Sequence, residues 1–130
     1  SEIFVQRGVS IDFGGSWLLP RRVGLHRAKE LTFLAEVIDA AEADRIGLVN
    51  RVVPADQLSD AVGAITDRLL QMAPVALAQT KRLLDASATS SFAEALDAEA
   101  AAQVVNFATD DAKEAVRAFR DKRPPNFTGH

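Results

Sequence analysis

Residues 12–24 read Asp-Phe-Gly-Gly-Ser-Trp-Leu-Leu-Pro-Arg-Arg-Val-Gly, and this stretch says more about the fold than any other part of the chain. A lone carboxylate, Asp12, stands just before the glycine pair Gly14 and Gly15. Glycines interrupt regular structure and let a bulky ligand approach the backbone, so the pair predicts a loop. From Ser16 onward the apolar residues recur at helical spacing, so we expect this loop to lead into a helix.

The sequence on either side of this stretch predicts short elements of both kinds. Residues 3–9 are short and apolar, which fits either a buried strand or a helical turn. A helix is expected over about 24–34, and Pro20 is compatible with a helix only in its first turn. The capping-box spacing at 39–42 predicts a short helix that stops near Gly47.

The pattern changes at Pro54. Residues 48–53 are rich in valine and predict a strand that Pro54 closes. After Pro54 the apolar residues recur every three or four positions, which predicts helices. Their expected ranges are about 58–72, 74–86, 92–107 and 110–122, the second beginning at Pro74 and the third opened by the capping box Ser91 to Glu94. We therefore expect a mixed α/β segment over 1–54 and a helical segment over 55–130.

The composition limits the classes of protein that remain. At 130 residues one domain is expected, and 48% apolar with 25% charged residues is ordinary for a soluble protein. The chain has no cysteine, so neither a disulfide nor a thiolate metal site is expected, and no His–carboxylate spacing indicates another metal site. The net charge of −3 argues against a nucleic-acid partner, and no apolar run approaches the ~18 residues of a membrane span. We expect a cytoplasmic protein with neither a membrane nor a nucleic-acid partner.

Four stretches, in this order along the chain, resemble the crotonase superfamily of enoyl-CoA hydratases and isomerases. They are residues 12–24, 38–43, 47–54 and 119–127. The resemblance implies an α/β fold that is mainly α in this chain. Residues 1–54 would form the end of the family's ββα spiral core, and residues 55–130 its helical trimerisation region. It also implies that the chain corresponds to the C-terminal half of the family fold, with Ser1 inside the last core strand.

Asp12 is the candidate catalytic residue. From residue chemistry alone, an Asp before a glycine pair more often closes a turn, although a partly desolvated carboxylate can act as a general base. Some crotonases carry a catalytic Glu on the last core strand, where this chain has Phe4. Others, similar to peroxisomal Δ3,Δ2-enoyl-CoA isomerases and to the ring-opening isomerases of phenylacetate breakdown, carry a carboxylate just before the glycine pair, where Asp12 stands. The resemblance therefore implies an enzyme, an isomerase in which Asp12 moves a proton within an acyl-CoA thioester.

Candidate binding residues flank this loop and lie near the C-terminus. Phe4, Phe13 and Trp17 could wall an acyl pocket, although Phe13 and Trp17 could equally be plain core. The resemblance implies that Lys122 and Phe127 contact the 3′-phosphate and adenine of coenzyme A, often in a neighbouring subunit. A frayed basic tail is the alternative for both residues. No separate cofactor is expected, because coenzyme A arrives as part of the substrate.

Two other functions remain open at this stage. A hydratase normally needs two carboxylates, and Phe4 stands where one of them should be. An inactive helical module for oligomerisation is the alternative from a different class. The resemblance implies a homotrimer or a dimer of trimers, with an acyl-CoA thioester as substrate. In the family the oxyanion hole comes from the other half of the fold, so residues 1–130 alone are expected to be inactive.

Overall fold

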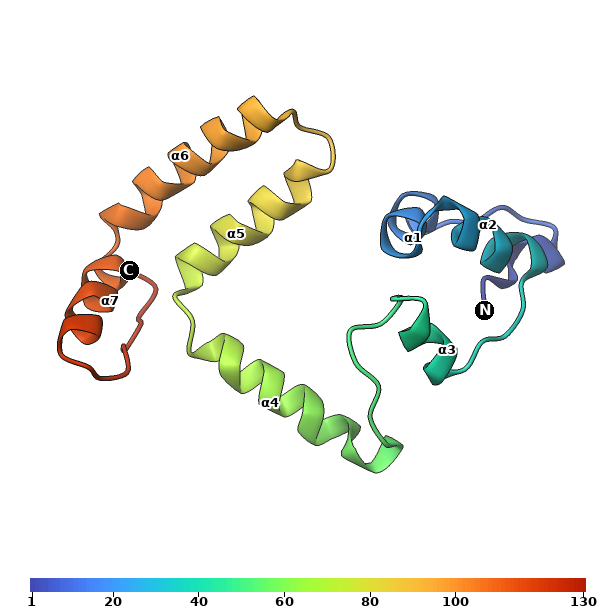
Figure 1. Ribbon diagram of the computed structural model, residues 1–130, viewed down its shortest axis with the longest axis horizontal. Coiled ribbons are helices and arrows are strands. Elements are labelled where there is room, and N and C mark those ends of the chain that lie inside the picture. The colour runs from blue at the N-terminus through green and yellow to red at the C-terminus, as the bar shows by residue number, and fades with distance from the viewer. The chain divides into compact units, whose positions relative to one another are not determined.

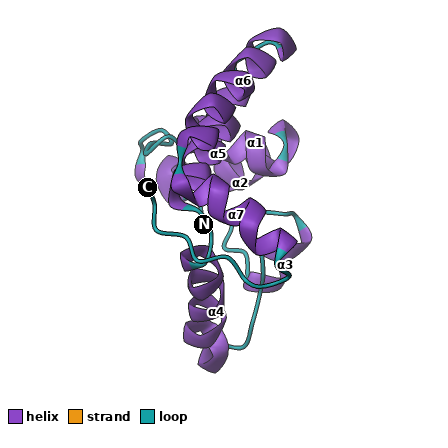
Figure 2. Ribbon diagram, turned by 90° about the vertical axis from the view of Figure 1, so that its left-hand side faces the viewer, coloured by secondary structure: helices purple, strands orange, loops and turns teal.

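The computed structural model describes all of residues 1–130, and they form two compact units, Ser1–Leu58 and Ser59–His130. Every regular element is a helix, as Figure 2 shows by its uniform purple ribbons. The first unit contains η1 (Ile3–Arg7), α1 (Gly15–Val23), α2 (Leu25–Leu34), α3 (Ala40–Arg45) and η2 (Ala55–Gln57), where η marks a 3₁₀-helix. The second contains α4 (Leu58–Leu70), α5 (Pro74–Ser87), α6 (Phe92–Ala108) and α7 (Asp110–Arg120).

The predicted strand over residues 48–53 is wrong. The N–H groups of Gly47 and Leu48 instead bond back to α3, at 2.9 Å from the carbonyl oxygens of Asp44 and Ala43 respectively. Residues 50–54 follow as irregular backbone. A strand needs a neighbouring strand to pair its backbone groups, and this chain supplies none. For the same reason residues 3–9 adopt the helical turn η1 and not a strand.

Helix α1 begins at Gly15, more than one turn before Pro20, although proline normally fits only the first turn of a helix. Gly14, with φ of 77°, brings the chain into the helix, and its carbonyl oxygen accepts from the N–H of Leu18 at 2.9 Å. Pro20 therefore lies inside α1, so the expectation that it sits in a first turn is wrong. The missing proline N–H leaves the carbonyl of Ser16 without its usual helical donor.

The core of the first unit is a small cluster between α1 and α2. Leu19 of α1 meets Ala28 and Leu31 of α2, and all three are buried. Partly buried side chains surround this cluster: Val23, Ile38, Ile46 and Leu48. The predicted helix over 24–34 is thus confirmed as α2, and its apolar face holds the unit together.

The second unit confirms the predicted succession of helices. Pro74 is the first residue of α5, and Ser91 and Glu94 form a complete capping box at the start of α6. Helices α5 and α6 run side by side in opposite directions, joined by a short turn (Figure 1), and α6 contacts α7. Thr109 caps α7, its side chain accepting from the N–H of Ala112 at 3.1 Å.

Candidate functional site

Asp12 lies at the first position of a tight turn that leads into α1. Its carbonyl oxygen accepts from the N–H of Gly15 at 2.8 Å, and the two residues between them, Phe13 and Gly14, have φ of 48° and 77°. Two successive positive φ values are the mark of a type I′ turn, for which Asn-Gly is the usual sequence. The carboxyl side chain of Asp12 is exposed. Asp12 therefore does close a turn, and that role leaves its side chain available for chemistry.

Phe13 is in a conformation that an aromatic residue rarely adopts. A non-glycine residue in the left-handed region costs roughly 1–2 kcal/mol, and its side chain is 94% exposed, so packing within this chain does not offset that cost. Strain of this kind tends to occur at functional sites. It makes the Asp12 turn a candidate functional segment.

Trp17 lies in the first turn of α1 and is 43% exposed. The Arg21 guanidinium lies 3.8 Å from the centre of its ring, and Arg21 also donates to the carbonyl of Trp17 at 3.0 Å. Neither Trp17 nor Phe13 is buried within residues 1–130. Phe4 is half-buried on η1, which packs against α2. The role of these three residues in an acyl pocket stays a prediction.

Lys122 follows α7 and has a left-handed backbone, with φ of 54°. Its N–H bonds to the carbonyl of Phe119 at 3.3 Å, and the N–H of Arg123 bonds to the carbonyl of Ala118 at 3.1 Å. This pair of bonds is the Schellman motif, whose left-handed position is usually glycine. The Lys122 side chain is exposed, and Phe127, in the segment that follows, is half-buried.

The segment after Lys122 is not a frayed tail. Arg123 forms two hydrogen bonds to the carboxylate of Glu114 on α7, at 2.6 and 3.1 Å. These bonds, followed by one from the N–H of Asn126, lower the pKa of Glu114 from 4.5 to about 2. The tail alternative for Lys122 and Phe127 is therefore wrong, while their contact with coenzyme A stays a prediction.

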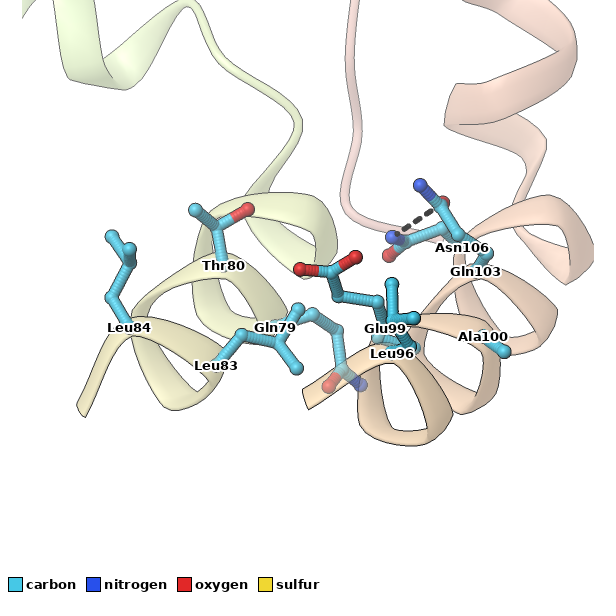
Figure 3. A pocket seen from close by; sticks show the side chains of 10 residues that line it. Gln79, Thr80, Leu83, Leu84, Leu96, Glu99, Ala100, Gln103 and Asn106 are labelled. Atoms are coloured by element: carbon cyan, nitrogen blue, oxygen red, sulfur yellow. Dashed lines mark hydrogen bonds between the residues drawn. The ribbon is translucent and has the colours of Figure 1, made fainter. Parts of the chain in front are cut away.

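A groove of 490 Å³ lies between α5 and α6, and none of the residues predicted for the site lines it. Figure 3 shows its lining, in which leucines and alanines alternate with the polar side chains of Gln79, Glu99, Gln103 and Asn106. Asn106 donates to Gln103 at 3.3 Å, and its own Oδ1 is buried without a partner. Sequence periodicity did not reveal this groove, because it depends on how two helices face each other. No cluster of residues suited to a metal ion occurs in the chain.

The family is shown by comparison with known proteins. Residues 1–130 match the enoyl-CoA hydratase/isomerase family, so the chain belongs to that family. The prediction made from the resemblance to the crotonase superfamily is confirmed. It is 41% identical to a crotonyl-CoA hydratase of Syntrophomonas wolfei, over 92% of this chain and 46% of that protein. None of its helices combines the length and the apolar character needed to cross a membrane.

Two solved structures are also similar to this chain in fold and sequence. An enoyl-CoA hydratase/isomerase from Cupriavidus metallidurans CH34 is 42% identical with a TM-score of 0.87, covering 96% of this chain and 47% of that one. An enoyl-CoA hydratase from Bacillus anthracis is 30% identical with a TM-score of 0.92, covering 97% and 49%. This chain therefore has the fold of the matching part of these enoyl-CoA hydratase structures. The chain spans about half the length of the relatives it matches.

Proposed function

We propose that the whole protein, meaning residues 1–130 together with the other half of the family fold, is an enoyl-CoA hydratase. It would add water across the double bond of a trans-2-enoyl-CoA. The observation that carries this proposal is the 41% identity, over 92% of this chain, to a protein named crotonyl-CoA hydratase. Membership of the enoyl-CoA hydratase/isomerase family supports the choice of an acyl-CoA thioester as substrate.

Asp12 is the acid/base group that this half of the fold offers. Its carboxylate is exposed at the entrance to α1, beside a glycine pair that leaves room for a ligand near the backbone. In a hydratase it would exchange a proton with the water that adds to C3 or with C2 of the thioester. A second carboxylate would then have to come from the other half of the fold, because Phe4 stands where some crotonases carry their catalytic Glu.

Double-bond isomerisation is the second candidate. It is favoured because this half of the fold offers the carboxylate of Asp12 but has Phe4 at the position where a hydratase would carry its Glu. A single carboxylate suffices to take a proton from the α carbon and return it to the γ carbon through a thioester enolate. The strained turn at Phe13 supports a functional role for this loop under either candidate. The two reactions differ in whether water enters the product, so one set of assays separates them.

The ends of the substrate have separate binding residues in this proposal. Phe13, Trp17 and Phe4 would contact the acyl chain, and Lys122 and Phe127 the 3′-phosphate and adenine. A homotrimer or a dimer of trimers is the proposed assembly. It is supported by large apolar side chains that stand exposed on α4 to α7: Val62, Ile65, Leu69, Leu70, Leu84, Phe92, Val104, Phe107 and Phe119.

Substitution of Asp12 tests the mechanism in the whole protein. Asp12→Asn keeps the size of the side chain but cannot accept a proton, so kcat should fall roughly 10²–10⁴-fold, the usual contribution of general acid–base catalysis. The matched control is Asp44→Asn, which alters an exposed carboxyl group on α3 and should leave kcat unchanged. Hydration is followed with crotonyl-CoA and the double-bond shift with a 3-enoyl-CoA.

Each outcome of these assays decides something. Fast hydration that Asp12→Asn abolishes supports the hydratase with Asp12 in its machinery. A double-bond shift without hydration transfers the proposal to the isomerase. Near-full activity of Asp12→Asn in both assays would leave Asp12 only the role of closing the turn.

A further inference from the structure

The segment after α7 folds back along that helix, and a buried carboxylate holds it there. Figure 1 shows the C-terminus beside the start of α7. Asp111 in the first turn of α7 is 2% exposed, the one charged residue buried in the chain. Its two carboxylate oxygens accept from the N–H of Thr128 at 2.7 Å and from the N–H of Gly129 at 2.9 Å. Hydrogen bonds to an ionised group are among the stronger ones in proteins, so this contact holds the returning segment firmly.

Glu114 forms a second anchor one turn further along α7. Besides its two bonds from Arg123, its carboxylate accepts from the N–H of Asn126 at 3.2 Å, and its side chain is 14% exposed. Residues three apart on a helix lie on the same face, so Asp111 and Glu114 present two carboxylates in a row to the returning segment. We call residues 123–129 the C-terminal strap.

His130, the residue after the strap, is held as well. The carbonyl oxygen of His130 accepts from the N–H of Asp110 at 2.6 Å and from that of Asp111 at 3.2 Å, which satisfies donors in the first turn of α7. Gly129 lies so close to the first residue of α5 that a Cβ added there would be 3.5 Å from Cγ of Pro74. The strap is thus held against α7 by hydrogen bonds, and its end lies near the start of α5.

The anchors bracket the two residues proposed to bind coenzyme A. Phe127 lies between Asn126, held by Glu114, and Thr128, held by Asp111. Lys122 immediately precedes Arg123, which Glu114 also holds. A binding side chain that is already ordered loses less conformational entropy when its ligand arrives. The carboxylates therefore hold the backbone on both sides of Phe127 and the side chain of the residue that follows Lys122.

We propose that Asp111 and Glu114 are positioning residues for the nucleotide end of coenzyme A, acting through the C-terminal strap on Phe127 and Lys122. This inference rests on the proposed acyl-CoA function. Neither carboxylate touches the ligand in this account. Each holds backbone or side-chain donors of the strap, so that ring and ammonium group face the nucleotide in one arrangement.

A comparison of two substrates in the whole protein tests this proposal. One is an enoyl-CoA, and the other is the same enoyl group on pantetheine, which lacks the nucleotide that Lys122 and Phe127 would contact. Asp111→Asn replaces one of the two acceptor oxygens by a donor, so one of the two strap N–H groups loses its partner. Glu114→Gln removes the ion pair with Arg123 and serves if Asp111→Asn does not fold. The matched control is Asp110→Asn, which alters an exposed carboxylate of the same helical turn, paired only with Lys113.

Both test variants should raise KM for the enoyl-CoA roughly tenfold, the effect of losing one hydrogen bond to a charged group. Their kcat, and their KM for the pantetheine thioester, should stay as in the unsubstituted protein. If the two carboxylates merely stabilised α7, their substitution would change the kinetic constants for both substrates alike. That result would overturn the proposal, and so would unchanged constants for both substrates. If the unsubstituted protein turned over neither thioester, the proposed function would fail by itself. Calorimetric titration with coenzyme A would then still decide whether the two variants bind it more weakly.

Discussion

Lys122 combines a strained backbone with a proposed binding role, and substituting it should separate the two. Its φ of 54° places it in the left-handed region at the end of α7, where the Schellman motif normally has glycine. That conformation costs a residue with a Cβ about 1–2 kcal/mol. Lys122→Gly removes this cost. The greater conformational freedom of glycine in the unfolded chain, however, lowers the free energy of unfolding by about 0.4–1 kcal/mol. The net expectation is a gain in unfolding free energy of about 0.5–1 kcal/mol.

Lys122→Ala is the matched control, because it also removes the ammonium group but keeps the Cβ and therefore the strain. Thermal unfolding of the whole protein, at one protein concentration, should place Tm of Lys122→Gly above that of Lys122→Ala. Both variants should raise KM for an enoyl-CoA about tenfold or more, since each loses a charge-assisted bond to phosphate. Lys122→Gly would then be a stabilising substitution that weakens function.

Two results would refute this reasoning separately. Equal Tm values for Lys122→Gly and Lys122→Ala would show that the left-handed backbone at this position carries no cost that glycine relieves. An unchanged KM in both variants would show that the ammonium group does not meet the substrate, whatever the stability result.

Other predictions concern the helix caps, acidity, activity and assembly. Ser91→Ala should lower the unfolding free energy by about 1 kcal/mol in urea denaturation, since it removes the side-chain cap of α6. Because the folded-state pKa of Glu114 is about 2 against 4.5, its stabilising contribution is complete above pH 4.5 and is lost as the pH falls toward 2. Arg123→Gln should therefore move acid unfolding, followed by circular dichroism, to higher pH. Residues 1–130 alone should convert no enoyl-CoA in a spectrophotometric assay, because the donors expected to stabilise the enolate lie in the other half of the fold. Light scattering should find the whole protein to be a trimer or hexamer, and a clean monomer would contradict the proposed assembly.

Local signals in the sequence were sufficient to predict the helices. The caps at Ser91 and Thr109 bond to N–H groups only three residues away, and Pro74 acts through its own fixed φ, so none of them depends on the rest of the fold. The stretch 12–24, together with the three later stretches, likewise predicted the family, and the match over residues 1–130 confirms it. The stretch 12–24 also led to Asp12 as the proposed acid/base group.

Interactions between distant residues were beyond the reach of the sequence. The valine-rich residues 48–53 are compatible with a strand, but a strand needs a partner, and the N–H of Leu48 bonds instead to the carbonyl oxygen of Ala43 in α3. Residues 123–129 resembled a loose basic end, yet Asp111 holds Thr128 across 17 positions of sequence. Only the folded arrangement brings that carboxylate to those amides. The sequence therefore determined the helices, their caps and the family, because those depend on near neighbours. Tertiary structure alone decided the strap and the positions of Lys122 and Phe127, because burying Asp111 requires donors from a segment that becomes its neighbour only on folding.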